Sequence, residues 1–96
     1  MKIVAIERDL KVVDWKNETQ NLIEEAKSVY RLMLSGILRE IYFSENKQAI
    51  LILECEDKIM AKNILTQLPL VINGTIDFDI IELHPYTGFG RLMEKI

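Results

Sequence analysis

Four side chains in this 96-residue sequence have the chemistry needed to move a proton, namely His84, Glu54, Glu40 and Tyr42. The imidazole of His84 has an ordinary pKa close to neutrality, so it can act as a general acid or base. A carboxylate becomes a useful base when burial raises its pKa, and a tyrosine hydroxyl can stabilise negative charge that develops on a substrate. These four residues are the predicted catalytic groups.

Glu40 and Tyr42 belong to one β-rich run, residues 37–44. Successive side chains on a strand point to opposite faces, so Glu40 and Tyr42 share a face, whereas the neighbours Arg39 and Glu40 do not. The structural alternative is that Glu40 is a charge that blocks edge-to-edge pairing of sheets. We therefore expect Glu40 and Tyr42, but not Arg39 and Glu40, to serve one site.

Glu54 and His84 each have a functional and a structural interpretation. Glu54 lies on the same side of its strand as Ile50 and Ile52, and such surroundings predict a raised pKa, although the end of a strand is open to water. His84 precedes Pro85, which holds it in an extended conformation, so it is either a general acid or base or a half-solvated turn residue. Both stay candidates for proton transfer.

Hydrophobic periodicity predicts the elements that must position these residues. Asp14 and Asp57 are predicted helix N-caps, Gly36 a left-handed helix end, and Pro69 a stop for the second helix. Three polar residues at 45–47 predict a hairpin turn. The expected elements are strand 2–8, helix 15–35, strands 37–44 and 48–55, helix 57–67 and strand 75–83.

This βαββαβ order predicts one α+β, ferredoxin-like domain over residues 1–84. The four strands form an antiparallel sheet with both helices on one face, and strands 2–8 and 48–55 lie at its centre. Both central strands are apolar on both faces, so the face without helices needs a cover. We expect a homodimer in which two such faces pack together.

The segment 85–96 extends beyond this domain and contains Tyr86, Phe89 and two glycines. Exposed aromatic pairs are typical of interfaces. We predict that the segment is an inter-subunit clasp, with Tyr86 and Phe89 as anchors on the partner and the glycines allowing the chain to turn closely over it.

Composition narrows the classes of function. The chain has 12 basic and 15 acidic residues, a net charge of -3, and no basic stripe, which disfavours nucleic-acid binding. One cysteine, Cys55, allows no intrachain disulfide and no multi-cysteine metal cluster. Apolar runs are too short for a membrane span or a secretory signal. These features predict a cytoplasmic protein without a membrane or nucleic-acid partner.

The segment from Leu65 to Pro85 carries a resemblance to a known family. It contains Gln67-Leu68-Pro69-Leu70 at the end of a helix and the pair His84-Pro85 after the last strand. This segment resembles the C-terminal half of the muconolactone isomerase family, small proteins of the dimeric α/β barrel superfamily. The resemblance implies obligate dimers of ferredoxin-like subunits and a proton shift, without any cofactor, in a small unsaturated lactone acid.

Three functions follow as hypotheses. The first is a muconolactone isomerase-like enzyme that acts on a small unsaturated lactone or organic acid, with no metal or other cofactor. The alternative is a non-catalytic dimeric module that binds a small ligand or serves in assembly, and a monooxygenase of the same superfamily is a third. A pocket between helices and sheet with two or more converging polar groups would favour an enzyme. Packing in the core is the expected role of Trp15, Tyr30 and Met33, although the space between helices and sheet can hold a small ligand in the superfamily that the segment resembles.

Overall fold

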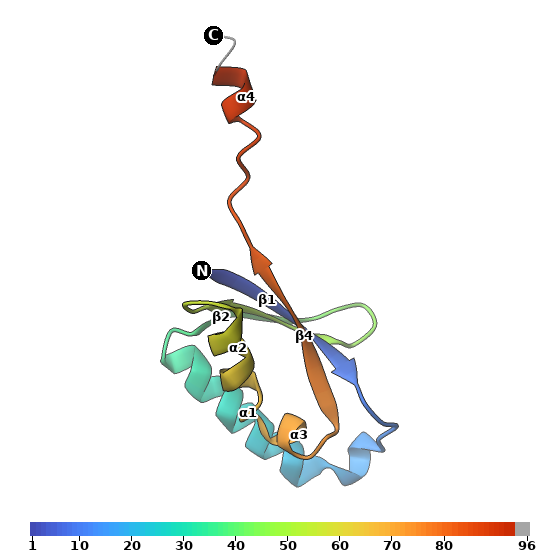
Figure 1. Ribbon diagram of the computed structural model, residues 1–96. Helices are drawn as coiled ribbons and strands as arrows, with labels where there is room; N and C mark the ends of the chain where they lie inside the picture. The colour runs from blue at the N-terminus through green and yellow to red at the C-terminus, as the bar shows by residue number, and fades with distance from the viewer. Residues whose placement is uncertain (94–96) are drawn as a thin grey trace.

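The computed structural model describes residues 1–93 and has the predicted α+β, ferredoxin-like fold. Its four antiparallel strands have the order β2-β3-β1-β4, which places β1 and β3 at the centre as expected. Helices α1, α2 and α3 lie on one face of this sheet, whereas α4 lies on the arm beyond β4 (Figure 1). The elements are β1 (Lys2–Asp9), η1 (Trp15–Asn17), α1 (Thr19–Leu34), β2 (Leu38–Phe43), β3 (Ala49–Glu54), α2 (Lys58–Leu65), α3 (Pro69–Ile72), β4 (Ile76–Leu83) and α4 (Gly90–Met93).

Local signals in the sequence explain several of these boundaries. The carboxylate of Asp57 accepts a hydrogen bond of 2.8 Å from the backbone N–H of Met60, which caps α2 as predicted. Gly36 follows α1 with φ at 84°, a conformation that glycine adopts without steric cost. Gly74 precedes β4 with φ at 72° and completes the predicted Asn73-Gly74 turn.

Two expectations about the helices need correction. Asp14 accepts a hydrogen bond from the N–H of Lys16 and so caps the short 3-10 turn η1, whereas α1 begins only at Thr19. The predicted helix 15–35 is therefore interrupted. α2 already ends at Leu65, four residues before Pro69, and Pro69 instead begins the short helix α3, because proline suits the first position of a helix.

The register of the sheet sorts alternate residues onto two faces. Val4 of β1 lies between Ile52 of β3 and Ile81 of β4, and all three face away from the helices. In β2 the register shifts between Leu38 and Glu40, which leaves a bulge at Arg39. The regular alternation expected for this strand is therefore broken between Leu38 and Glu40.

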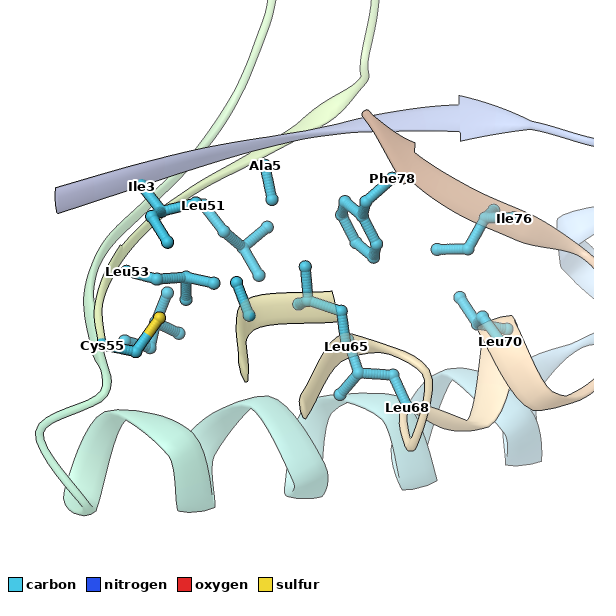
Figure 2. Close-up of a cluster of buried hydrophobic side chains, with 12 residues drawn as sticks. Ile3, Ala5, Leu51, Leu53, Cys55, Leu65, Leu68, Leu70, Ile76 and Phe78 are labelled. Atoms are coloured by element: carbon cyan, nitrogen blue, oxygen red, sulfur yellow. The ribbon is translucent and has the colours of Figure 1, made fainter. Parts of the chain in front are cut away.

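The core lies between the sheet and the α2–α3 segment. Figure 2 shows side chains from β1, β3 and β4 pointing toward α2 and α3, with α1 beyond them. The most buried members of the cluster are Ile3, Leu38, Leu51, Leu53 and Leu65. By contrast, α1 contributes no buried residue along its described length of 16 residues.

The expected core packing of Trp15, Tyr30 and Met33 is therefore wrong. Their side chains are 37%, 62% and 41% exposed, respectively. The apolar face of α1 points toward the sheet but does not fill the space below it.

Within residues 1–93 no helix covers the other face of the sheet, which carries apolar side chains at its centre, as predicted. Val4, Ile6, Ile50 and Ile52 are partly exposed there, and Ile81 is 46% exposed.

Residues 84–93 form an arm that leaves the end of β4 and projects away from the rest of the domain (Figure 1). The arm contributes to a long molecule with principal extents of 61 × 27 × 19 Å. Within it, the rings of Tyr86 and Phe89 pack edge to face with centroids 4.9 Å apart, and both residues are exposed. Residues 94–96 of the predicted clasp lie outside the described part of the chain.

Candidate functional site

A cleft of about 810 Å³ lies between α1 and the sheet. Its walls come from α1, η1, β1, β4, α3 and the β2–β3 hairpin, and most of its lining is apolar. Aromatic rings line it at Trp15, Tyr30, Phe43 and Phe78. A cleft of this size and lining suits a small organic molecule.

Glu7 brings a carboxyl group into this apolar cleft from β1. Its Oε1 accepts a hydrogen bond of 2.9 Å from the backbone N–H of Ala49, which fixes the carboxyl beside the start of β3. Burial raises the pKa of Glu7, and a hydrogen bond to Asp9 and the negative charges of Asp9 and Glu25 raise it further. The bond from Ala49 opposes these effects.

Glu25 reaches the same cleft from α1. Its Oε1 accepts a hydrogen bond of 3.0 Å from the backbone N–H of Leu70, so it also satisfies a free donor in the first turn of α3. Burial raises the pKa of Glu25, and the bond from Leu70 partly offsets that rise. Glu25 therefore links α1 to α3 while adding a second carboxyl to the cleft.

The remaining polar lining is Asp9, Asn46 and Lys47. Lys47 lies at the turn of the β2–β3 hairpin with φ at 63°, and it is the one cation among the described lining residues. A carboxylate with a raised pKa is a stronger base than an ordinary one, and Asn46 and Lys47 can donate hydrogen bonds to a developing oxyanion. Within residues 1–93, no three His, Cys, Asp or Glu side chains are placed to hold a metal ion.

The four residues predicted from sequence lie outside this cleft. Glu40 and Tyr42 are on the face without helices, and the Tyr42 hydroxyl donates a hydrogen bond of 2.7 Å to Glu40 Oε1. This contact raises the pKa of Tyr42. The prediction that Glu40 and Tyr42 share a face is confirmed, and their catalytic role stays a prediction.

Glu54 does not have the raised pKa that its strand position predicts. Its Oε1 accepts a hydrogen bond of 2.8 Å from the Met1 ammonium group, and this contact lowers the pKa. The charges of Met1, Arg39 and Lys2 lower it further, and the Glu54 side chain is 40% exposed. Glu54 is therefore in a polar, charged environment.

His84 lies where β4 ends and the arm begins. Its side chain is 68% exposed, and Nε2 is 3.4 Å from Glu82 Oε2. No hydrogen bond or ion pair found in residues 1–93 joins His84 to Glu40, Tyr42 or Glu54. The structure thus pairs two of the predicted residues and leaves the other two apart from them.

Sequence reasoning missed Glu7 and Glu25, although both carry a signal. Glu7 lies two residues after Ala5 and four after Ile3, on the side of β1 that faces the helices. Glu25 lies three residues after Leu22, within the apolar stripe of α1. A carboxylate at a helix-facing or core-facing position marks a candidate for a tuned pKa.

Comparison with known proteins supports the fold. No family model matches the sequence, and no curated protein matches it. The solved structure of muconolactone isomerase matches with a TM-score of 0.73 and 19% identity, over 91% of this chain and 92% of the enzyme.

A second solved structure is the 5-chloro-2-hydroxyhydroquinone dehydrochlorinase from Burkholderia phenoliruptrix, in complex with 2,5-dihydroxybenzoquinone. It matches with a TM-score of 0.65 and 10% identity, over 90% of this chain and 97% of the dehydrochlorinase. In the described residues, no helix is long and apolar enough to cross a membrane. The two structural matches establish that the chain has the ferredoxin-like α+β fold of muconolactone isomerase.

Proposed function

We propose that this protein is a muconolactone isomerase-like enzyme that shifts a proton within a small unsaturated lactone, without a cofactor. The observation that carries this proposal is the Glu7 carboxyl, whose pKa is raised inside an aromatic-lined cleft. The fold shared with muconolactone isomerase supports the reaction class. Of the two substrate types predicted from sequence, a lactone or an organic acid, the acidic lining favours the uncharged lactone.

Glu7 acts as the base in this mechanism. Its carboxylate takes a proton from the carbon beside the lactone carbonyl, and the C–H electron pair moves into the carbonyl to form an enolate. The same carboxyl then returns the proton to the far carbon of the conjugated system, so the double bond moves and Glu7 is regenerated. Asn46 and Lys47 supply hydrogen-bond donors for the enolate oxygen.

The test uses α-angelica lactone as the probe, in deuterated water. Proton exchange and double-bond migration are followed by NMR. Because a positioned general base contributes about 100-fold or more, Glu7→Gln should lower the rate by at least that factor. The matched control is Glu24→Gln, since Glu24 lies next to Glu25 on α1 and pairs with Lys27 outside the cleft. An unchanged rate in Glu7→Gln would contradict the role of Glu7.

The site predicted from sequence provides an alternative for the same reaction. It places proton transfer on His84, with Glu54, Glu40 and Tyr42 as further groups. His84→Ala would then abolish the exchange, whereas the cleft mechanism predicts a rate close to that of the unmodified protein. The two variants together assign the reaction to one site.

A non-catalytic, ligand-binding module is the second candidate function. The observation that favours it is that Glu7 and Glu25 both accept backbone hydrogen bonds. Both carboxyl groups therefore have structural roles. In that case, the lactone would bind in the cleft with no deuterium exchange above the rate in buffer.

We also propose that the protein is a homodimer. Two features of the described residues support a dimer. One is the apolar sheet face around Val4 and Ile52, over which no described helix lies. The other is the projecting arm, on which Tyr86 and Phe89 are exposed. Two copies that pack these faces together would bury both, and each arm would lie on the partner.

A further inference from the structure

The cleft combines aromatic rings with an excess of negative charge. Trp15 and Tyr30 approach from the helical side and Phe43 and Phe78 from the sheet. The face of an aromatic ring carries partial negative charge and attracts cations, most strongly for tryptophan.

The described lining of the cleft contains three carboxyl groups and one cation. Glu7 and Asp9 come from β1, Glu25 comes from α1, and Lys47 comes from the β2–β3 hairpin. The lining residues from β4 and α3 are apolar. A ligand with a carboxylate would add a further negative charge to this cluster, whereas a ligand with an ammonium group would neutralise part of it.

We propose that the cleft selects its ligand by charge, accepting a small aromatic or unsaturated ring that bears an ammonium group and excluding the same kind of ring that bears a carboxylate. The ring lies against Trp15 and the phenylalanines, and the ammonium group faces Glu7 and its acidic neighbours. This inference rests on the proposed function only for the location of the site. Selection by charge can hold whether or not the protein catalyses a proton shift.

The affinity of the cleft for the ammonium ligand should increase with pH. An ammonium group favours the ionised form of Glu7, so its binding drives a proton off that carboxyl. Affinity for the cation therefore rises as pH increases through the raised pKa of Glu7, whose ordinary value is 4.5. The charged groups around Glu7 are Asp9 and Glu25, whose negative charges raise its pKa, and Lys47, the cation of the described lining.

The single tryptophan of the chain makes this measurable, because Trp15 lines the cleft and its fluorescence reports on occupancy. Three probes of similar size are titrated: phenethylamine, phenethyl alcohol and phenylacetate. We expect phenethylamine to bind about tenfold or more tightly than phenylacetate, with the alcohol between them. Phenylacetate binding as tightly as phenethylamine, or no response to any of the three, would overturn the proposal.

Variants locate the source of the selectivity. Glu7→Gln and Glu25→Gln keep an amide oxygen that can accept the bonds from Ala49 and Leu70, so folding should be retained. Each should reduce the ratio of phenethylamine to phenylacetate affinity by about threefold or more, and Glu24→Gln should leave the ratio unchanged. An unchanged ratio in both cleft variants would contradict the assignment. A selective cleft with no lactone exchange would reject the proposed reaction alone, and lactone exchange without charge selectivity would reject this inference alone.

Discussion

The two faces of the sheet are built from alternate residues of the same strands, yet their surroundings differ. On β3, Leu51 and Leu53 lie under the helices and are 1% and 0% exposed, whereas Ile50 and Ile52 on the opposite face are partly exposed. Both pairs are equally apolar. Apolar side chains alone therefore do not make a core, because a second layer of structure must also cover them.

The helix-covered face is itself divided. Below α2 and α3 the side chains pack closely, while below α1 the cleft stays open and holds Glu7 and Glu25. The packed half supports the fold, and the open half has room for a ligand. On the opposite face, the apolar side chains of the described strands contribute none of the cleft's lining. This face suits contact with a second subunit.

The largest expected effect on stability comes from shortening a buried side chain in the packed half of the helix-covered face. Leu53→Ala should lower the free energy of unfolding by about 2–5 kcal/mol, because a fully buried leucine leaves a cavity. Its neighbour Ile52→Ala removes a similar volume from the other face. Urea titrations should show a smaller loss for Ile52→Ala, one that depends on protein concentration if Ile52 is at a subunit interface. Equal, concentration-independent losses would erase the distinction between the faces.

A charge on the uncovered face should break the proposed dimer. Ile52→Asp places a carboxylate at the centre of the proposed interface, where it would lack a partner, and dissociation should increase by about 100-fold or more. Light scattering should report the mass of a single subunit. Ile59→Asp is the control, because Ile59 is 72% exposed on α2. A single-subunit mass for the unmodified protein would reject the dimer itself.

Removing the arm should have a smaller effect on the same equilibrium. Deletion of the chain after His84 takes away Tyr86 and Phe89, and aromatic anchors dominate many interfaces. We expect the dissociation constant to rise by about tenfold, measured by sedimentation at several concentrations. If the constant stays the same, the arm is not a clasp.

The smallest expected effect is on the pH dependence of stability, and it has opposite signs for Glu7 and Glu54. Burial raises the pKa of Glu7 above its ordinary 4.5 in the folded protein, so its stabilising contribution is complete below that value and is lost as pH rises through the raised pKa. The Met1 ammonium lowers the pKa of Glu54, so that contribution is present above the ordinary value and is lost as pH falls through the lowered one.

Urea titrations across pH should resolve the two windows. Glu7→Gln should reduce the loss of stability as pH rises above 4.5, to which Glu25 also contributes, and Glu54→Gln should reduce the loss as pH falls below 4.5. If both variants change the free energy of unfolding in the same pH range, the assignment of opposite pKa shifts to Glu7 and Glu54 is wrong.

Most of the fold could be predicted because its signals are local. Asp57 marks the start of α2 and Gly36 the end of α1 by their own chemistry, and alternation marks the strands. The interruption after Asp14 cannot be predicted in this way, because the same carboxylate can cap either a 3-10 turn or a longer helix. Periodicity also shows which side of α1 faces the sheet, but it cannot show how far α1 stands from it.

The candidate site was harder to predict because it depends on contacts between residues that are far apart in the sequence. The pKa of Glu54 depends on Met1, which lies 53 residues away in sequence, and that contact is invisible to strand alternation. The cleft depends on the distance between α1 and the sheet, so Tyr30 was expected in the core and is exposed instead. Only the positions of Glu7 and Glu25 within apolar stripes could have indicated the site.

The most direct test of the cleft as the functional site is a crystal structure of the Glu7→Gln variant soaked with α-angelica lactone. This variant should keep the hydrogen bond from Ala49 and should not turn the lactone over. We predict ligand density between α1 and the sheet, against Phe43 and Phe78 and within hydrogen-bond distance of the residue at position 7. Density at His84 or on the uncovered face, with the cleft filled by its own side chains, would contradict the account.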